Sequence, residues 1–358
     1  MHVLFFADQH LESLGGAQVS MRLQRRFLEK AGHTVSVVAP ALHGRRARGA
    51  APDPAYLDMP SIAITPDREY SFTWPGRRTD RWVDAAVARR GPVDLVHVQA
   101  DFWGAFIGHR FAARHALPVV HTMHNRVDVG IEATAPLPGL VLRALNGWAG
   151  RVLPRGARVR GHDGWAYLRR LAALSDAVTA PSGHFARRLE GHGVFGHVDV
   201  IWNGIDDDIL DAVLAAETPR VAGPPRLVWL GRMSPEKRLL PFLEALGEAD
   251  VTAEVEVLGG GAQLAAAQRV VQRRGLEASV TFSGRLSYPE TLRWMAAADA
   301  LVQTSIGFET QGMTPFEAAS LGTPSIISDP DIGHELGSGF WQVPDATVAA
   351  LARTLRRA

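Results

Sequence analysis

The sequence predicts an α/β protein with two parallel sheets in tandem. Its 358 residues suggest two domains, at about 150 residues per domain. Short apolar runs alternate with longer stretches of helical periodicity, and the alternation starts again in the second half. Strands separated by helices of this size are typical of βαβ units, in which neighbouring strands are parallel. We therefore expect two doubly wound, Rossmann-like sheets that face a cleft, where such folds bind ligands.

Short apolar runs in the first half predict buried parallel strands. These runs are Val3–Ala7, Thr34–Ala39, Leu95–Val98, Pro118–His121, Ala177–Ala180 and Val198–Ile201. Helical periodicity predicts one helix from Ala17 to Ala31, which Gly32 ends, and another from Trp103 to His115. The apolar face of the first helix would consist of Val19, Leu23, Phe27 and Leu28.

Three stretches of the first half interrupt this pattern. Residues 43–56 and 60–80 are rich in Gly and Pro or contain repeated Pro, and we expect loops there. After the break at Ala135–Gly139, residues 140–152 have the pattern of an amphipathic helix. Trp148 lies there among Arg143, Arg151, Arg155, Arg158 and Arg160. This basic segment fits either a membrane surface or a solvated helix that packs on its own domain.

The second half repeats the strand and helix alternation. Strands are predicted at Leu227–Leu230, Ala253–Leu258, Val280–Phe282, Ala300–Gln303 and Ser325–Ser328. Helices are predicted at Lys237–Leu246, Gln263–Arg274 and Pro315–Leu321. A second parallel sheet follows from this order.

The composition excludes several kinds of site. The sequence contains no cysteine, which excludes disulfides, cysteine-ligated zinc, iron–sulfur clusters and a cysteine nucleophile. No apolar run reaches the roughly 18 residues of a membrane span. The first ten residues lack a basic segment and contain Asp8, unlike a signal peptide, so we expect a cytoplasmic protein. No nucleic-acid recognition motif is present, and we expect no nucleic-acid partner.

Glycines and bases at two strand ends suit a phosphate ligand. Gly15 and Gly16 follow the first strand and open a helix, where the backbone can approach a phosphate closely; the alternative is a simple turn. In the second half, Gly231 and Arg232 end a strand, and Ser234-Pro235 then predicts a helix start. Arg232 and Lys237 could converge on a diphosphate, whereas two solvated bases at a helix N-terminus would be mildly unfavourable.

A third block, from Glu309 to Glu317, follows a strand and enters a helix. The amides of Gly312, Met313 and Thr314 lie at the predicted helix N-terminus and could hold phosphate oxygens. A carboxylate on either side could accept hydrogen bonds from sugar hydroxyls; the alternative for Glu317 is that its charge only favours the helix N-terminus. The block suits a nucleotide sugar, with ribose at one end, diphosphate in the middle and hexose at the other.

Two Asp-x-Asp sequences imitate a metal motif. Asp206–Asp208 fits a helix cap, and Asp329–Asp331 follows a strand as a plain turn would. The histidines show no HExxH motif or other fixed metal spacing. We expect neither a metal site nor a resident cofactor.

These motifs together resemble the retaining GT4 glycosyltransferases, which have the GT-B fold. Four features carry the resemblance: Glu309 and Glu317 with seven residues between them, the segment from Gly231-Arg232 to Lys237, the Gly15-Gly16 loop, and Asn203–Asp206. The resemblance runs from residue 3 to about residue 340. It implies an acceptor-binding domain over residues 1–203 and a nucleotide-sugar-binding domain over residues 204–358. It also implies a helix that crosses back to the first domain, for which only Ala346–Arg357 remains, so that this helix is expected to be short or missing.

A narrower likeness concerns the acceptor. Glu309–Thr314 (ETQGMT) is similar to the ETQGLT variant of GT4 enzymes that glycosylate diacylglycerol-type lipids, and residues 59–62, 97–104 and 118–124 are similar to their first domain. This chain departs from them at Asn125 and at Arg126–Asp128. A membrane glycerolipid is the expected acceptor, with a soluble sugar or polysaccharide acceptor, or a non-catalytic binding subunit, as alternatives.

The resemblance also implies a role for each matching residue. Arg232 and Lys237 would neutralise the donor diphosphate and the leaving group. Glu309 would bind the donor sugar, Glu317 the ribose and the amides of residues 312–314 the phosphate. His124 would lie near the reacting carbon, and Gly15 and Gly16 would leave room for the donor phosphate and the acceptor. Gly231 would belong to the donor-binding residues, and Arg285 would flank the base.

The net charge of +1 hides an asymmetry between the two predicted domains. Residues 1–203 carry 25 basic and 17 acidic side chains, a balance of +8, and residues 204–358 carry 13 and 20, a balance of −7. A basic first domain suits anionic headgroups at the inner face of a membrane. The alternative is a surface bias that only keeps the protein in solution.

Overall fold

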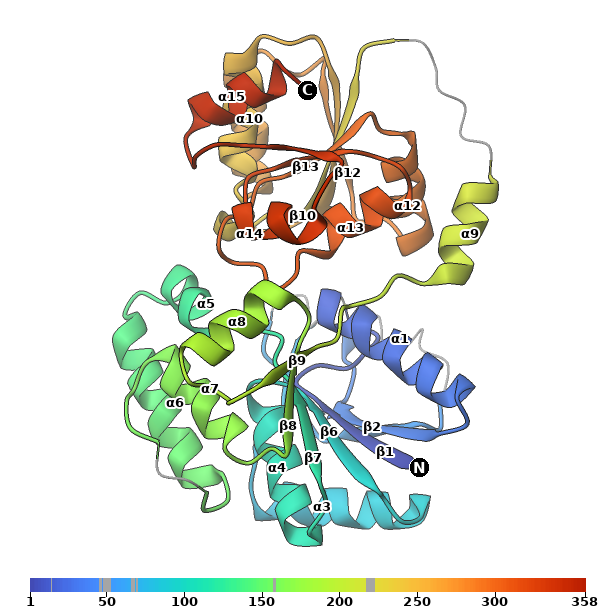
Figure 1. The fold of residues 1–358 in the computed structure, drawn as a ribbon, viewed down its shortest axis with the longest axis vertical. Helices are drawn as coiled ribbons and strands as arrows, with labels where there is room; N and C mark the ends of the chain where they lie inside the picture. The colour runs from blue at the N-terminus through green and yellow to red at the C-terminus, as the bar shows by residue number, and fades with distance from the viewer. Residues whose placement is uncertain are drawn as a thin grey trace. The chain divides into compact units, whose positions relative to one another are not determined.

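The chain folds into two compact units, Met1–Gly204 and Ile205–Ala358 (Figure 1). The computed structural model of the protein describes residues 1–13, 15–44, 47, 53–65, 68, 70–156, 159–216 and 223–358. Arg158 of the predicted basic segment therefore lies outside the described residues. Each unit has its own sheet and its own hydrophobic core.

The sheet of the first unit has seven strands in the order β3-β2-β1-β6-β7-β8-β9, and all of its neighbouring pairs are parallel. The strands are β1 (His2–Ala7), β2 (Thr34–Pro40), β3 (Tyr56–Met59), β6 (Leu95–Gln99), β7 (Val119–Thr122), β8 (Ala177–Ala180) and β9 (Val198–Val200). The chain starts at β1, moves outward to β3 and returns to the other side of β1 with β6. Strand order reverses there, so the carboxyl ends of β1 and β6 mark the expected ligand position.

Helices cover both faces of this sheet (Figure 1). They are α1 (Gly16–Lys30), α3 (Arg77–Val87), α4 (Trp103–His115), α5 (Val127–Thr134), α6 (Pro138–Val152), α7 (Gly164–Ala172) and α8 (Gly183–Gly191), with a 3₁₀ turn at Ala88–Arg90. Alternate residues of β1 face opposite cores, with Leu4 and Phe6 in one and Val3 and Phe5 in the other. This two-sided burial explains the continuous apolar runs of the sequence.

Two expectations for the first unit were wrong in detail. The second predicted loop, residues 60–80, contains the start of α3 and a small antiparallel pair, β4 (Ile62–Ala63) with β5 (Ser71–Phe72), while β3 lies between the two predicted loops and overlaps the first only at Tyr56. Helix α1 buries Gln18, Ser20, Met21 and Leu23, whereas Phe27 is 44% exposed. Leu23 is buried and Leu28 packs against the core, as predicted, but the buried face also includes the polar residues Gln18 and Ser20. Phe27 lies near the helix end and contacts the Lys30 ammonium, 5.3 Å from the ring centre.

The sheet of the second unit has six parallel strands in the order β12-β11-β10-β13-β14-β15. These are β10 (Arg226–Arg232), β11 (Glu254–Gly260), β12 (Val280–Gly284), β13 (Ala300–Gln303), β14 (Ser325–Ile327) and β15 (Phe340–Gln342). The helices are α9 (Asp207–Ala215), α10 (Leu239–Ala249), α11 (Leu264–Arg274), α12 (Tyr288–Ala297), α13 (Met313–Ser320), α14 (Pro330–Leu336) and α15 (Val348–Leu355). Strand order reverses between β10 and β13, so their carboxyl ends mark the second expected ligand position.

Three details of the second unit differ from the expectations. Ser234-Pro235 starts a 3₁₀ turn, Pro235–Lys237, and α10 begins only at Leu239 because Arg238 adopts a left-handed φ of 55°. Asp329 caps α14 instead of forming a plain turn, since its carboxylate accepts the Asp331 amide at 3.0 Å. Asp206 caps α9, as predicted. Strand β15 and helices α12 and α14 were not predicted.

The last helix, α15, belongs to the second unit. It packs against α10, and Leu351 and Leu355 join the core that α10 lines with Leu243 and Leu246. Arg356 fixes the end of this segment, because its guanidinium donates to the carbonyls of Ala249 (2.9 Å) and Glu248 (2.6 Å). Residues 346–357, the segment considered for a crossover helix, therefore serve the second sheet.

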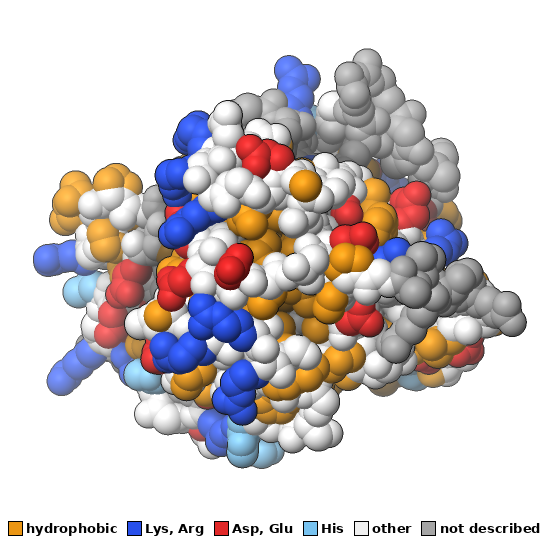
Figure 2. Space-filling view, turned by 90° about the horizontal axis from the view of Figure 1, so that it is seen from above, with side chains coloured by type: hydrophobic (Ala, Val, Ile, Leu, Met, Phe, Trp, Pro, Cys, Tyr) orange, Lys and Arg blue, Asp and Glu red, His pale blue; other side chains and the backbone are white. Residues whose placement is uncertain are grey.

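Neither a membrane span nor a metal-binding cluster is found among the described residues. No described helix is long and apolar enough to cross a membrane. Within the same ranges, no group of three or more His, Asp or Glu side chains could hold a metal ion. Figure 2 shows basic and acidic side chains mixed over the visible face, with uncharged atoms between them.

Candidate functional site

The candidate donor half-site of the second unit lies at the carboxyl ends of β10 and β13. Lys237, in the 3₁₀ turn after β10, forms an ion pair through Nζ with Oε1 of Glu309, which follows β13. Ser305 donates to the same carboxylate oxygen at 2.7 Å. Both partners are mostly buried, with 26% and 16% of their side chains exposed. The structure thus brings together one predicted phosphate ligand and the predicted sugar ligand.

Hydrogen bonds from the sheet hold this ion pair in place. The indole of Trp229 in β10 donates to the Thr304 hydroxyl at 2.9 Å, and that hydroxyl donates to the Lys237 carbonyl at 2.6 Å. Gln303 donates to the Ser305 hydroxyl at 2.6 Å, which directs the hydroxyl proton of Ser305 toward the Glu309 carboxylate. Buried groups of two central strands therefore position Lys237 and Glu309.

Helix α13 begins beside this cluster at Gly312, Met313 and Thr314. Gly312 has a left-handed φ of 75°, and a Cβ atom there would lie 2.6 Å from Cδ1 of Ile332. Conformation and close packing both favour glycine. The amides at this N-terminus are the backbone donors that the sequence assigns to phosphate oxygens.

Glu317 lies one turn inside α13 and is buried, with 5% exposed. The hydroxyl of Tyr288 at the start of α12 donates to Oε1 of Glu317 at 2.9 Å. Burial raises the pKa of Glu317 to about 7, and the Tyr288 hydrogen bond opposes this shift. The sequence did not single out Tyr288, because α12 itself was not predicted.

Arg232 and Arg285 occupy the same carboxyl edge of the sheet. Arg232 pairs in register with Gly260 of β11, and Gly284 at the end of β12 pairs with Leu258 of the same strand. Arg285 follows β12, and its Nε lies 3.6 Å from the position of a Cβ on Gly260. Both arginines are exposed. Gly231, one residue before Arg232, packs beside the Trp229 ring, which a Cβ would meet at 3.3 Å.

The candidate half-site of the first unit centres on His124, just after β7. Its Nε2 donates to Oε1 of Gln99 at 2.8 Å, and its backbone amide donates to Oδ2 of Asp101 at 3.0 Å. His124 is only 9% exposed. Burial lowers its pKa to about 4, although the nearby Asp101 carboxylate opposes this shift. The ring is therefore neutral at pH 7, with one donor and one acceptor nitrogen.

Asp8 joins β1 to this half-site. Its carboxylate accepts the amides of Asp101 (2.8 Å), Phe102 (3.0 Å) and Gly104 (2.8 Å), and thereby satisfies the N-terminus of α4. Burial, followed by the neighbouring Asp101 carboxylate, raises the pKa of Asp8 to about 7. We interpret Asp8 as the residue that joins β1 to α4.

The residues that depart from the lipid-acting pattern make contacts within the first unit. The Asn125 amide donates to Asp101 Oδ2 at 2.7 Å. Arg126 forms a two-bond ion pair with Asp128 at 3.0 and 2.9 Å, and its guanidinium lies 5.5 Å from the centre of the Trp165 ring. These side chains therefore stabilise the loop that carries His124.

Gly15 and Gly16 stand exposed at the start of α1, and Gly15 is its N-cap with a φ of 153°. A Cβ on Gly15 would lie 2.2 Å from the Gln18 side-chain oxygen.

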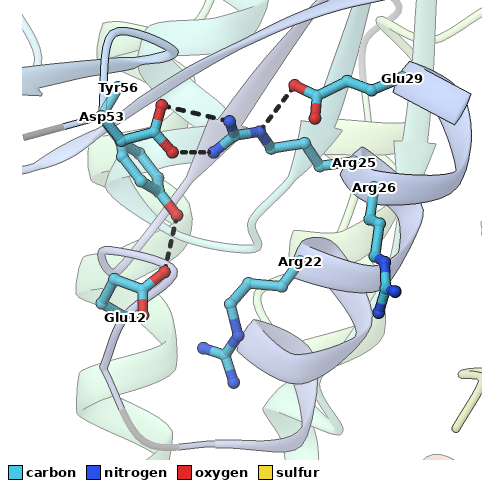
Figure 3. A pocket seen from close by; sticks show the side chains of 7 residues that line it. All are labelled: Glu12, Arg22, Arg25, Arg26, Glu29, Asp53 and Tyr56. Carbon is cyan, nitrogen blue, oxygen red and sulfur yellow. Dashed lines mark hydrogen bonds and ion pairs between the residues drawn. The ribbon is translucent and has the colours of Figure 1, made fainter. Parts of the chain in front are cut away.

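Further along α1, Arg25 lines a shallow pocket of about 190 Å³ and forms a bidentate pair with Asp53 at 2.6 and 3.2 Å (Figure 3). The other lining residues are Glu12, Arg22, Arg26, Glu29 and Tyr56. The formal charges of the lining cancel, and the Arg25–Asp53 pair attaches α1 to the segment before β3.

Most of the sequence matches models of known families. Residues 14–209 match Glycosyltransferase Family 4, and residues 224–358 match Glycosyl transferases group 1. The chain belongs to glycosyltransferase family 4. This GT4 enzyme is 25% identical, over 339 residues, to the alpha-monoglucosyldiacylglycerol synthase of Streptococcus pneumoniae (strain ATCC BAA-255 / R6). The match covers 91% of this chain and 70% of that protein.

Solved structures show the same fold as this GT4 glycosyltransferase. The sucrose-phosphate synthase of Thermosynechococcus elongatus is similar with a TM-score of 0.71 and 18% identity, over 99% of this chain and 88% of that one. Anabaena Alr3699/HepE in complex with UDP-glucose is similar with a TM-score of 0.68 and 16% identity, over 100% and 89% of the two chains. The two doubly wound units are therefore the GT-B architecture predicted from the sequence.

Several residues around the GT4 half-sites were not assigned by sequence reasoning. Gln99, Asp101, Ser305 and Tyr288 contact His124, Glu309 or Glu317 from neighbouring elements. A signal existed for Gln99 and Asp101, because polar residues that directly follow a buried run mark the carboxyl end of a strand. Tyr288 gave no such signal, since its partner lies 29 positions away.

Proposed function

We propose that this GT4 glycosyltransferase transfers a hexose from a UDP- or GDP-linked donor to a membrane glycerolipid, with retention of the anomeric configuration and without a metal ion. The observation that carries the donor part is the Lys237–Glu309 pair beside the N-terminus of α13. It combines a cation, backbone amides and a carboxylate within one half-site. The structures of Alr3699/HepE with UDP and with UDP-glucose support a UDP-linked donor.

Each donor residue has a role in this proposal. Lys237 and Arg232 neutralise the diphosphate and the charge that develops on it as the sugar leaves. Glu309 accepts hydrogen bonds from sugar hydroxyls, and Glu317 accepts them from the ribose. Arg285 flanks the base, and Gly231 leaves room for the donor. The mostly buried Lys237 and the exposed Arg232 perform the work that a metal ion performs in other transferases.

In the first unit, His124 contacts the donor sugar near its reacting carbon. Because its ring is neutral at pH 7, we infer that it acts as a hydrogen-bonding group and does not carry a positive charge. Gly15 and Gly16 leave space for the donor phosphate and the acceptor, since neither presents a side chain.

The lipid acceptor is supported by the S. pneumoniae relative, whose name states a monoglucosyldiacylglycerol product, and by the ETQGMT segment at Glu309. Helix α6 adds a physical argument. It buries Leu142, Asn146 and Ala149 against its own unit but leaves Leu137 and Leu140 each 61% exposed. Exposed apolar residues next to arginine suit the interface of an anionic bilayer.

Donor class is tested by thermal unfolding with UDP-, GDP- and ADP-sugars, because a ligand that binds the folded state raises its apparent stability. We expect a rise with a UDP- or GDP-sugar and little change with an ADP-sugar.

Acceptor class is tested by incubating the labelled donor with extracted membrane lipids or with soluble sugars. Label in the lipid fraction supports the proposal, whereas label only in soluble products favours the soluble-acceptor alternative. No transfer and no donor-dependent stabilisation would indicate a non-catalytic subunit.

A further inference from the structure

A buried chain of side-chain hydrogen bonds connects α1, β6 and the His124 loop. The Gln99 amide nitrogen donates to Oε1 of Gln24 at 2.5 Å, and Oε1 of Gln99 accepts from His124 Nε2 at 2.8 Å. Gln99 is 2% exposed, and water therefore does not compete for its amide. The three side chains come from elements that are far apart in the sequence, and each contacts the next.

The position of Gln99 in the sheet explains how it reaches both neighbours. It is the last residue of β6 and pairs in register with Ala7, the last residue of β1. Val98 belongs to the core on the opposite face of the sheet from α1, and side chains alternate along a strand. Gln99 consequently points to the α1 side at the carboxyl edge, where the loop after β7 carries His124.

The backbone of His124 is fixed as firmly as its ring. Asp101 is completely buried and accepts both the His124 amide and the Asn125 side chain. Asp101 is itself held through its amide by Asp8 and through its carbonyl by the Tyr167 hydroxyl at 2.5 Å. Residues 99–101 thus hold His124 at two points, which leaves its ring one preferred orientation.

We propose that Gln99 is a positioning residue that fixes the His124 ring in the tautomer with a proton on Nε2, and that Gln24 extends this restraint to α1. The proposal rests on the proposed contact of His124 with the donor sugar. A neutral imidazole has one donor and one acceptor nitrogen, so the side chain facing Nε2 decides which nitrogen can accept a hydrogen bond. Through Gln24, the same restraint reaches the helix that Gly15 opens.

The direct test is nitrogen-15 NMR of histidine-labelled protein without ligand. The His124 signals are assigned by their loss in His124→Gln. We expect the Nε2-protonated tautomer in the wild type and a mixture of tautomers in Gln99→Met, which keeps the side-chain length but removes the acceptor. Gln99→Glu retains an acceptor oxygen and should restore the single tautomer with a raised histidine pKa. An Nδ1-protonated ring in the wild type, or an unchanged tautomer in Gln99→Met, overturns the proposal.

Kinetics separate positioning from general damage to the fold. We expect Gln99→Met to lower kcat about tenfold with little change in the donor KM, and Gln24→Met to have a smaller effect in the same direction. Gln9→Met is the matched control, because Gln9 is another buried glutamine of this unit, bonded to the Ser71 backbone at 2.8 and 3.0 Å. Equal losses of kcat in Gln9→Met and Gln99→Met would refute a specific role for Gln99.

The two readouts also distinguish this proposal from the proposed function. If the tautomer changes in Gln99→Met but His124→Gln keeps wild-type turnover, Gln99 positions the ring while the catalytic role of His124 is wrong. If Gln99→Met unfolds, the His124 tautomer in the wild type and in Gln99→Glu still tests whether Gln99 positions the ring.

Discussion

At the scale of single residues, the two candidate glutamates of the donor half-site have different surroundings. Glu309 faces an ammonium group and a hydroxyl, whereas buried Glu317 has Tyr288 as its hydrogen-bond donor. Burial raises the pKa of Glu317 to about 7, so its charge changes in the physiological range. If Glu317 binds the ribose as proposed, this pKa makes nucleotide affinity sensitive to pH.

UDP binding should therefore weaken as the pH falls from 8 to 6. Glu317 is ionised above its raised pKa and protonated below it, and only the carboxylate offers all its lone pairs to ribose hydroxyls. We expect the dissociation constant from calorimetry to rise by up to about tenfold over this range. The pH dependence of the dissociation constant that remains in Glu317→Gln is due to the nucleotide phosphate itself. An equally steep pH dependence in that variant would contradict the assignment of Glu317 to the ribose. Tyr288→Phe should move the transition to higher pH.

Loss of either charge of the Lys237–Glu309 pair should reduce catalysis more than stability. Under the proposed assignment, Lys237→Ala removes a cation from the diphosphate and Glu309→Ala removes the sugar ligand, so we expect turnover to fall about tenfold or more in each. The pair is mostly but not completely buried, and its loss should cost only about 1 kcal/mol of unfolding free energy. Lys30→Ala, at the other lysine of the chain, is the control. Wild-type turnover in both site variants would refute the assigned site.

The residues that the sequence identified share a local signature. Lys237, Gly312 and Glu317 lie just after a strand or at a helix start, which spacing along the chain reveals. Tyr288 and Ser305 could not be assigned in the same way, because their importance depends on three-dimensional neighbours. His124 was found only through the family resemblance, since a lone histidine carries no local pattern.

At the scale of elements, the Arg25–Asp53 ion pair attaches α1 to the segment before β3, and its contribution to stability can be tested. Arg25 bridges Asp53 and Glu29, and its hydrogen bonds hold the pKa of Asp53 below its usual value. Asp53→Ala should lower the free energy of unfolding by about 1 kcal/mol at pH 7. This contribution is present above the unfolded-state pKa and is lost as the pH falls through the lower folded-state pKa. Denaturant unfolding at pH 7 and pH 3 should show a larger difference between variant and wild type at pH 7.

Helix α6 permits an element-scale test of membrane contact. Leu140 is 61% exposed on α6, and Trp74, 66% exposed, lies against Trp148 of that helix with ring centres 5.7 Å apart. We expect Leu140→Gln combined with Trp74→Ser to weaken sedimentation with anionic vesicles about tenfold at low salt, because apolar area no longer enters the interface. Leu214→Gln, at an exposed leucine of α9, is the matched control. No wild-type binding, or equal binding by the double variant, would contradict membrane contact through α6.

The elements themselves were largely predictable. The central strands of both sheets are apolar runs bounded by polar or glycine residues, and β8 and β13 match their predicted ranges. Prediction was less complete at the periphery. The edge strands β9 and β12 were predicted, whereas the edge strands β3 and β15 and the seven-residue helix α14 were not. The left-handed Arg238 has no sequence signature comparable to glycine.

At the scale of the whole molecule, the charge asymmetry gains a structural context. The balance of +8 belongs to the unit that contains α6, and the balance of −7 to the unit that contains the candidate donor half-site. Under the proposed assignment this acidic unit binds a nucleotide anion, so it must concentrate positive charge locally. Arg232 at the end of β10 and Lys237 in the following 3₁₀ turn do this, and the net negative charge of the unit makes the placement of these two cations more important.

The two units are contiguous in sequence, and the chain passes between them once, at residues 204–205. Under the proposed assignment, every donor contact except those of Gly15, Gly16 and His124 is encoded after this point. Recombination at a single position would therefore exchange the nucleotide-sugar half of the gene as one module. Acceptor preference could diverge by mutation of the first segment while the donor chemistry stays intact, which suggests a simple genetic route to new glycoconjugates.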